Sequence, residues 1–156
     1  MSQTTELERT LAAARRLNIQ ASIMVAQEMA KLDSATDSNL VMEWIISALR
    51  SRSHETFAFV FVDQGRRVLD RWVMPEASRT RTVCYPRLVA KRALAVDATG
   101  FWMAHNHPGG MPTPSPQDRE LTRQMQMHMK ALEITLIDHF IVTNESTVSF
   151  REQGYL

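Results

Sequence analysis

The stretch from His105 to Asp118, HNHPGGMPTPSPQD, gathers two histidines, one aspartate and four prolines into fourteen residues. Imidazole nitrogens and a carboxylate are groups that bind divalent metals, and proline restricts the backbone that carries them. His105 and His107 are two residues apart at the end of an apolar run. Because successive strand side chains alternate between faces, both imidazoles can point the same way while Asn106 points away.

The residues that follow are typical of a helix start. Ser115 suits the N-cap, Pro116 suits the first helical position, and Asp118 falls at the third. We therefore expect the carboxylate of Asp118 in the first turn of a helix, on a backbone that a rigid loop could bring back to the two imidazoles.

Two imidazoles and one carboxylate are a typical zinc ligand set when the fourth position is left to water. Zinc lowers the pKa of such a water to ~7, so that hydroxide is available at neutral pH. A structural zinc is usually closed by four protein ligands, often thiolates, and Cys84 is the sole cysteine. The pattern therefore favours an open, catalytic site. The alternative is that the His-x-His pair lies at the surface or makes ordinary hydrogen bonds.

The elements that must position these groups can be predicted from the spacing of apolar residues. Residues 5–33 and 40–49 have helical spacing, with a polar break at 33–39. We place a soft boundary near residue 36, between an N-terminal helical appendage (1–36) and the main domain (37–156). In that domain the pattern predicts strands at 57–62, 67–74, 100–104, 134–142 and 147–150, and helices beginning at Pro86 and spanning 116–132. This mixed order predicts an α/β domain with a mixed sheet flanked by helices.

Two segments indicate where the core lies. Phe57–Val62, FAFVFV, is apolar on both faces, which predicts a central buried strand, and DQGR at 63–66 predicts a hairpin turn after it. Met125, Met127 and Met129 stand in the last predicted helix. Met125 and Met129 share a helix face, which favours core packing over a soft-metal surface, with Met127 elsewhere on the helix.

The 156-residue chain is 44% apolar and 22% charged, which is a globular composition. No apolar run is long enough to cross a bilayer, and the N-terminus lacks the run that a secretion signal needs. A single cysteine permits no intrachain disulfide. We therefore expect a cytoplasmic protein with no membrane partner. The net charge of +1 gives nucleic-acid binding only weak support, because duplex-binding domains usually carry a larger basic excess.

The spacing His105-x-His107-Pro108, followed by Ser115-x-x-Asp118, resembles the JAMM motif of MPN/JAB-type metalloproteases, and more closely the RadC family. The similarity extends to YPR and KRAL before the loop, to PTPSPQDRELT within and after it, and to LIDHFIV and VSFREQG near the C-terminus. It covers roughly residues 37–156 and is carried by a compound motif. It implies a JAB/MPN-like (cytidine-deaminase-like) mixed sheet flanked by helices.

The resemblance implies Zn²⁺ held by His105, His107 and Asp118, with water as the fourth ligand. It also implies a glutamate near the start of the first core strand, a position that Glu55 matches. A carboxylate there could accept a proton from the water and return it to a leaving amine; the alternative is a solvent-facing strand-start residue. The resemblance further implies that the hydroxyl of Ser115 assists a developing oxyanion.

Asp138 and His139 belong to the family pattern as well. Asp138 could orient a ligand imidazole, or it could make a structural hydrogen bond. The sequence departs from the pattern at Gly109, where the family loop commonly has serine, and this puts substrate contacts there in question. Many relatives carry a helix-hairpin-helix-like domain, but residues 1–36 lack its glycine hairpin, so DNA binding through that domain is not implied.

We therefore predict a zinc-dependent hydrolase, metalloprotease- or isopeptidase-like, that attacks an unidentified peptide or other amide with a zinc-activated water. The alternative is a RadC-like factor of DNA repair or recombination that binds partners or nucleic acid without robust hydrolysis. An interaction module without turnover is a third hypothesis, against which the intact ligand set argues. A zinc deaminase would need a Pro-Cys-x-x-Cys segment, which the chain lacks. The sequence leaves open whether the N-terminal helix forms a homodimer or covers the site.

Overall fold

The computed structural model of this chain describes residues 3–30, 38–75 and 83–156. Five strands form one mixed sheet in the order β2-β1-β3-β4-β5. β3 and β4 are parallel, and the other neighbouring strands are antiparallel. The elements are α1 (Gln3–Ala30), α2 (Ser38–Leu49), β1 (Phe57–Val62), β2 (Val68–Val73), α3 (Pro86–Ala95), β3 (Gly100–Asn106), α4 (Pro116–Lys130), β4 (Thr135–Val142) and β5 (Thr147–Ser149). The predicted mixed α/β fold is confirmed.

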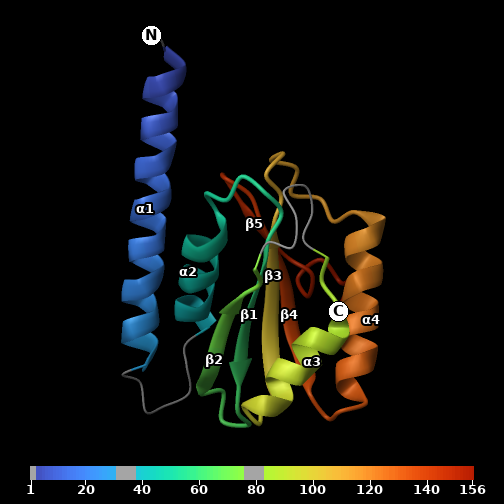
Figure 1. Cartoon of the computed structure of the whole chain (residues 1–156). Coiled ribbons are helices and arrows are strands. Elements are labelled where there is room, and N and C mark those ends of the chain that lie inside the picture. Colours follow the sequence, from blue (N-terminus) through green and yellow to red (C-terminus); the bar gives the residue numbers. More distant parts are fainter. Residues whose placement is uncertain (1–2, 31–37, 76–82) are drawn as a thin grey trace.

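The sheet lies between two layers of helices (Figure 1). α3 and α4 cover one face, α2 covers the other, and the long helix α1 packs along α2 on the outside. All six residues of β1 are buried because helices cover both faces of the sheet at this strand. Phe57, Phe59 and Phe61 pack toward α3 and α4, and Ala58 and Val60 pack toward α2. The alternation of strand side chains thus explains why β1 is apolar at every position.

The topology brings three chain segments to one edge of the sheet. β3, α4 and β4 form a crossover between parallel strands, so the carboxyl ends of β3 and β4 lie at the same edge. β1 runs antiparallel to β3, and Phe57 pairs with His105. The chain that leads into β1 therefore meets the end of β3 and the start of α4. In open α/β sheets, ligands bind at the edge where parallel strands end.

The element boundaries differ from the predicted ones in small ways. β3 extends to Asn106, and α4 ends at Lys130, so that Leu132 lies beyond the helix and is 41% exposed. Met125 and Met129 are fully buried, which confirms the predicted core packing. The predicted domain boundary near residue 36 and most of the polar break at 33–39 lie outside the described residues. Over the part of the chain that the structure describes, no helix is long and apolar enough to cross a membrane.

Candidate metal centre

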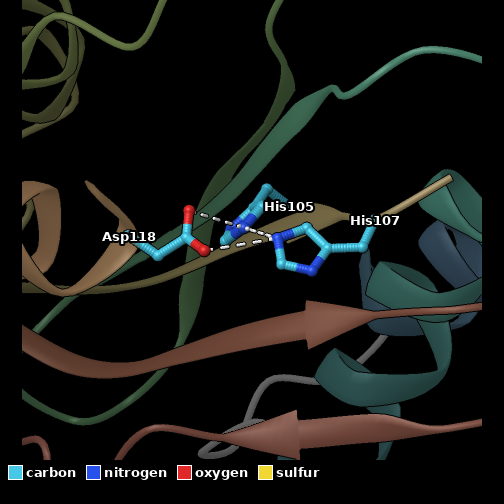
Figure 2. A group of neighbouring side chains, drawn as sticks. All are labelled: His105, His107 and Asp118. Carbon is cyan, nitrogen blue, oxygen red and sulfur yellow. Dashed lines mark hydrogen bonds and ion pairs between the residues drawn. The ribbon is translucent and has the colours of Figure 1, made fainter. Parts of the chain in front are cut away.

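The structure brings His105, His107 and Asp118 together at the end of β3. One potential ligand atom from each lies within 4.8 Å of the others. Figure 2 shows the carboxylate of Asp118 facing both imidazoles. The Nε2 atoms of His105 and His107 are 2.9 Å apart. Asp118 Oδ1 lies 3.2 Å from His105 Nε2, and Asp118 Oδ2 lies 3.3 Å from His107 Nε2.

Strand geometry accounts for the placement of the two imidazoles. His105 belongs to β3, and its ring stacks on Phe57 in the layer below α4, with the ring centroids 5.1 Å apart. His107 follows two residues later and is held by its backbone N–H, which donates to the carbonyl of Val142 on β4. The intervening residue points to the opposite side of the chain, as strand alternation predicts.

The start of α4 presents the carboxylate. Ser115 is the N-cap, its hydroxyl oxygen accepts from the backbone N–H of Asp118, and its own backbone N–H donates to Asp118 Oδ2. This reciprocal pair is a capping box, with aspartate in the place that glutamate often takes. The predicted helix start is therefore confirmed. The cap fixes the Asp118 side chain against the helix end and leaves it facing the histidines.

Electrostatics bind the three groups to one another. The hydrogen bond with Asp118 raises the pKa of His107; partial burial opposes this shift, and the contact with the Met111 carbonyl adds to it. Burial alone would raise the pKa of Asp118, but the bonds with His105, His107 and Ser115 outweigh it and hold that pKa well below its usual range. The carboxylate of Asp118 is therefore ionised, which is the form that binds metals.

The distances fit a zinc ion. Two ligand atoms ~2.0 Å from a tetrahedral zinc lie roughly 3.3 Å from each other. Here the two Nε2 atoms are 2.9 Å apart, and each lies at a similar distance from a different oxygen of the Asp118 carboxylate: His105 Nε2 is 3.2 Å from Oδ1, and His107 Nε2 is 3.3 Å from Oδ2. Metal-ligating imidazoles commonly engage their second nitrogen elsewhere, and both rings do so: His107 Nδ1 is 2.7 Å from the carbonyl oxygen of Met111, and His105 Nδ1 is 2.8 Å from His139 Nε2. The group could therefore hold a metal ion.

Glu55 lines the same depression as Asp118. The two carboxylates share a cavity of about 250 Å³ with Phe57, Cys84 and Leu121, among others. The negative charge of Glu55 also adds to the raised pKa of His107. The structure thus places Glu55 next to the His-His-Asp group, although 50 residues separate Glu55 from His105 in the sequence.

Asn106 positions the segment that carries Glu55. Its side-chain oxygen accepts from the backbone N–H of Thr56 at 2.7 Å, and its nitrogen donates to the carbonyls of Arg52 and His54 at 3.2 and 3.0 Å. The residue is almost fully buried, so these bonds replace the ones that its side chain would make to water. The residue between the two histidines therefore anchors both sides of Glu55. Sequence reasoning predicted only that Asn106 points away from the imidazoles.

The Ser115 hydroxyl is engaged with its own helix. It donates to Asp118 Oδ2 at 2.7 Å while its oxygen accepts from the Asp118 backbone N–H. The helix-start role is thereby confirmed. Its role toward an oxyanion stays a prediction, because the hydroxyl proton would first have to leave Asp118.

Asp138 does not contact either histidine of the group. Its Oδ1 accepts from the backbone N–H groups of His139 and Arg151, and its Oδ2 accepts from the hydroxyl of Ser149. These bonds tie the end of the chain to β4, so Asp138 has the structural role and does not orient an imidazole. His139, the next residue, points to the other face and contacts His105 instead. The sequence signals at His139 were its place inside an apolar predicted strand and its place in the family pattern, and neither indicated which residue it contacts.

Two further residues bear on the sequence predictions. Cys84 is buried, and burial raises the pKa of its thiol to about 12, so at neutral pH it is not the thiolate that binds metals. Gly109 has open space where a Cβ would lie, whereas Gly110 has a φ of +82°. The glycine at 109 is therefore not required by its surroundings, and the one at 110 is favoured by its backbone conformation.

Comparison with known proteins places these observations in a family. The family model described as "RadC-like JAB domain" matches residues 35–155. A UPF0758 protein of Pseudomonas fluorescens is 36% identical over 132 residues, which are 85% of this chain and 59% of that protein. A UPF0758 protein of Dechloromonas aromatica is 38% identical over 133 residues, with the same coverage.

A third relative covers more of both chains. A UPF0758 protein of Chromohalobacter salexigens is 33% identical over 154 residues, which are 96% of this chain and 69% of the relative. The chain spans about three fifths of the length of the first two curated relatives, 59% in each case. The names of these relatives state no activity. Membership of the family therefore identifies the type of domain but not a chemical activity.

Proposed function

The chain belongs to the RadC-like JAB domain family, and from this membership and the geometry of its site we propose that it is a zinc-dependent hydrolase of amide bonds, peptidase- or isopeptidase-like. One observation carries the proposal. His105 Nε2, His107 Nε2 and the Asp118 carboxylate converge at separations of 2.9, 3.2 and 3.3 Å. Three protein ligands leave one position free, as in catalytic zinc sites.

His105, His107 and Asp118 would hold the zinc. Each imidazole offers Nε2 because its Nδ1 is engaged with another group. Asp118 Oδ2 accepts two hydrogen bonds from Ser115, from the backbone N–H and the hydroxyl. Oδ1, which lies 3.2 Å from His105 Nε2, is therefore the oxygen that we assign to the metal, although the oxygen 3.3 Å from His107 Nε2 in the structure is Oδ2. When bound, zinc would supply a water that ionises near neutral pH and a Lewis acid for the substrate carbonyl.

Glu55 is the proposed general base and acid. Its carboxylate would take a proton from the attacking water and pass it to the amine that leaves when the amide bond breaks. Two observations support this role. Glu55 lines the same cavity of about 250 Å³ as Asp118, and its negative charge raises the pKa of His107. Asn106 would keep the carboxylate in place through the bonds to Thr56 and His54.

Ser115 would assist the oxyanion that forms at the substrate carbonyl. Its hydroxyl now donates to Asp118 Oδ2. The proposal requires that the hydroxyl rotate toward the substrate, while the backbone N–H of Ser115 keeps its bond to the carboxylate. A Ser115→Ala variant would then lose turnover and keep its zinc; loss of zinc would indicate that the hydroxyl mainly supports Asp118.

The test combines metal analysis with hydrolysis. Protein purified without added metal is analysed for zinc, then loaded with zinc and assayed on a library of fluorogenic peptides and isopeptide-linked lysines. We expect one zinc per chain, turnover in the unaltered protein, and no turnover in Glu55→Gln with zinc retained. Turnover at the wild-type rate in Glu55→Gln would overturn the assigned role, and absence of zinc from the loaded protein would overturn the site.

The alternative, a module that binds partners or nucleic acid without hydrolysis, has weaker support. The net charge of +1 provides no basic excess for a phosphate backbone. A zinc-loaded protein that cleaves nothing in the library yet binds single-stranded or branched DNA in a salt-sensitive manner would favour this alternative.

A further inference from the structure

A continuous line of buried polar contacts runs behind the metal centre. His105 Nδ1 lies 2.8 Å from His139 Nε2 on β4. His139 Nδ1 lies 2.7 Å from the hydroxyl oxygen of Thr122 on α4. That hydroxyl lies 2.6 Å from the backbone carbonyl oxygen of Asp118. The side chains of His105, His139 and Thr122 are at most 1% exposed, so water cannot replace any of these partners.

The direction of each hydrogen bond follows from the last one. A carbonyl oxygen can only accept, so the single proton of the Thr122 hydroxyl must lie on the bond to Asp118. Thr122 Oγ1 can then only accept from His139, which requires a proton on His139 Nδ1. The His139 imidazole is fully buried, and its two nitrogens face a hydroxyl and another imidazole; among the described residues no carboxylate is hydrogen-bonded to its ring, so a positive charge there would be uncompensated and the ring is neutral. His139 Nε2 is therefore a lone pair, and it accepts from His105 Nδ1.

We propose that Thr122 and His139 form a hydrogen-bond relay that fixes the Nδ1–H tautomer of His105 and so makes its Nε2 the metal-binding atom. The relay starts at the backbone carbonyl of Asp118, which can only accept a hydrogen bond. This fixes the position of the Thr122 hydroxyl proton, which fixes the proton of His139 on Nδ1, which in turn requires a proton on His105 Nδ1. His139 is held in position by Phe150, on which its ring stacks with the centroids 4.3 Å apart. Thr122 and His139 are thus positioning residues, which do not touch substrate or metal.

The relay also connects two of the proposed ligands. It begins at the backbone of Asp118 and ends at the ring of His105, while the side chains of the same two residues face each other across the site. It therefore joins α4 to β3 by way of β4. His107 is oriented separately, since its Nδ1–H donates to the carbonyl of Met111 in its own loop. We therefore expect loss of the relay to affect His105 and Asp118 and to leave the orientation of His107 unchanged.

Thr122→Val is the informative variant. It removes the hydroxyl and keeps nearly the same shape. Without the hydroxyl, His139 can carry its proton on Nε2 and donate it to His105 Nδ1. A neutral His105 would then have to carry its own proton on Nε2, the atom that is needed for the metal. We expect zinc affinity, measured by competition with a chromogenic chelator, to fall roughly 10- to 100-fold, the range seen for groups behind metal ligands. Thr122→Ser restores the hydroxyl and should bind zinc within about twofold of wild type on the same scale.

Ser149→Ala is the matched control. It also removes a buried hydroxyl bond, the one to Asp138 at 2.6 Å, from the strand pair behind the site. We expect it to lower the melting temperature and to leave zinc affinity unchanged. An affinity loss in Ser149→Ala equal to that in Thr122→Val would overturn the relay, because general loosening of β4 would then explain both. Wild-type affinity in Thr122→Val would overturn it as well.

A second measurement needs no metal and no activity. Selective ¹⁵N labelling of histidine, with long-range ¹⁵N–¹H correlation at pH 8 on the metal-free protein, reports which ring nitrogens carry protons. We expect a proton on Nδ1 of both His105 and His139 in wild type, whether or not His105 Nε2 also carries one toward Asp118, and loss of the proton from His105 Nδ1 in Thr122→Val. A His105 Nδ1 without a proton in wild type would overturn the relay. The zinc part of the inference rests on the proposed function, whereas this spectrum tests the relay even if no zinc binds.

Discussion

The first two turns of α4 and its last two turns bury the same helix face with opposite chemistry. Asp118 and Thr122 are buried in the first half, and Met125 and Met129 are buried in the second. The methionines contribute apolar area to the core between the sheet and helices α3 and α4. The polar pair instead makes directed contacts, with Asp118 toward two imidazoles and Thr122 toward a third. A single amphipathic helix thus serves the core at one end and the site at the other.

The difference shows how the site affects the stability of the fold. A buried methionine stabilises the fold by leaving water, without any requirement for a particular partner. A buried carboxylate or hydroxyl costs free energy unless its bonds are made. In the first half of α4 these bonds lead from Asp118 and Thr122 to the histidines and Ser115. We therefore expect changes in the second half to affect stability, and changes in the first half to affect metal binding.

The largest effect on stability should come from the apolar half. Met129→Ala removes a fully buried side chain, and the resulting cavity should lower the free energy of unfolding by about 2–5 kcal/mol. Urea denaturation measures this loss, and chelator competition on the folded protein should give an unchanged zinc affinity. A parallel loss of zinc affinity would break the distinction between the two halves.

The largest effect on metal binding should come from the polar half. Asp118→Asn keeps an oxygen that can accept from the Ser115 backbone N–H but loses the negative charge. Zinc affinity should fall by more than about 100-fold, beyond the range of groups that merely support ligands. The free energy of unfolding of the metal-free protein should change by about 1–2 kcal/mol, the range of a weakened helix cap. Zinc at one per chain with wild-type affinity in this variant would remove Asp118 from the ligand set.

A third prediction concerns the pH dependence of zinc binding. It separates the two halves of α4 further, because Met125 and Met129 have no titratable group, whereas Asp118 is bonded to the titratable His107. The bond with Asp118 raises the pKa of His107, so its proton competes with the metal above the usual value of ~6.5. Zinc affinity should therefore be full above the raised pKa and fall about tenfold per pH unit below it. Calorimetric titration between pH 6 and 8.5 tests this, and a flat profile over that window would contradict it.

The metal-free protein should show the opposite trend. Because the folded pKa of His107 is raised, its charged form contributes stability that is fully present below ~6.5 and is lost as pH rises through the folded pKa. The melting temperature of the metal-free protein should fall across this window through that contribution. A His107→Gln variant should not show the change, which separates this residue from the rest of the chain.

The smallest effect is expected in the loop that precedes α4. Gly109→Ser fills open space and should change the free energy of unfolding by no more than about 0.5 kcal/mol. Gly110→Ser places a side chain at φ +82° and should cost about 1 kcal/mol or more. Thermal unfolding of the two variants side by side measures the difference. Equal destabilisation would indicate that Gly109 is constrained by something other than its backbone and its neighbours.

Much of the fold and part of the site could be predicted because the signals are local. The uninterrupted apolar run FAFVFV indicates a strand buried on both faces, and Ser115-Pro-Gln-Asp118 indicates a capped helix start. The spacing of His105 and His107 on one side of a strand end is local as well. These features involve residues within five positions of each other, so backbone geometry alone relates them.

The sequence by itself therefore determined which side chains could bind a metal and which local elements present them. Only the tertiary structure decided what supports them: the contact of His105 with His139 spans 34 residues, that of His139 with Thr122 spans 17, and the bond from Asn106 to His54 spans 52. It also decided that the Asp138 carboxylate accepts from the hydroxyl of Ser149 on β5 and from the backbone N–H groups of His139 and Arg151, and not from an imidazole. The physical reason is that such contacts depend on strand register and on the crossover through α4, which bring distant residues together without any spacing that the sequence reveals.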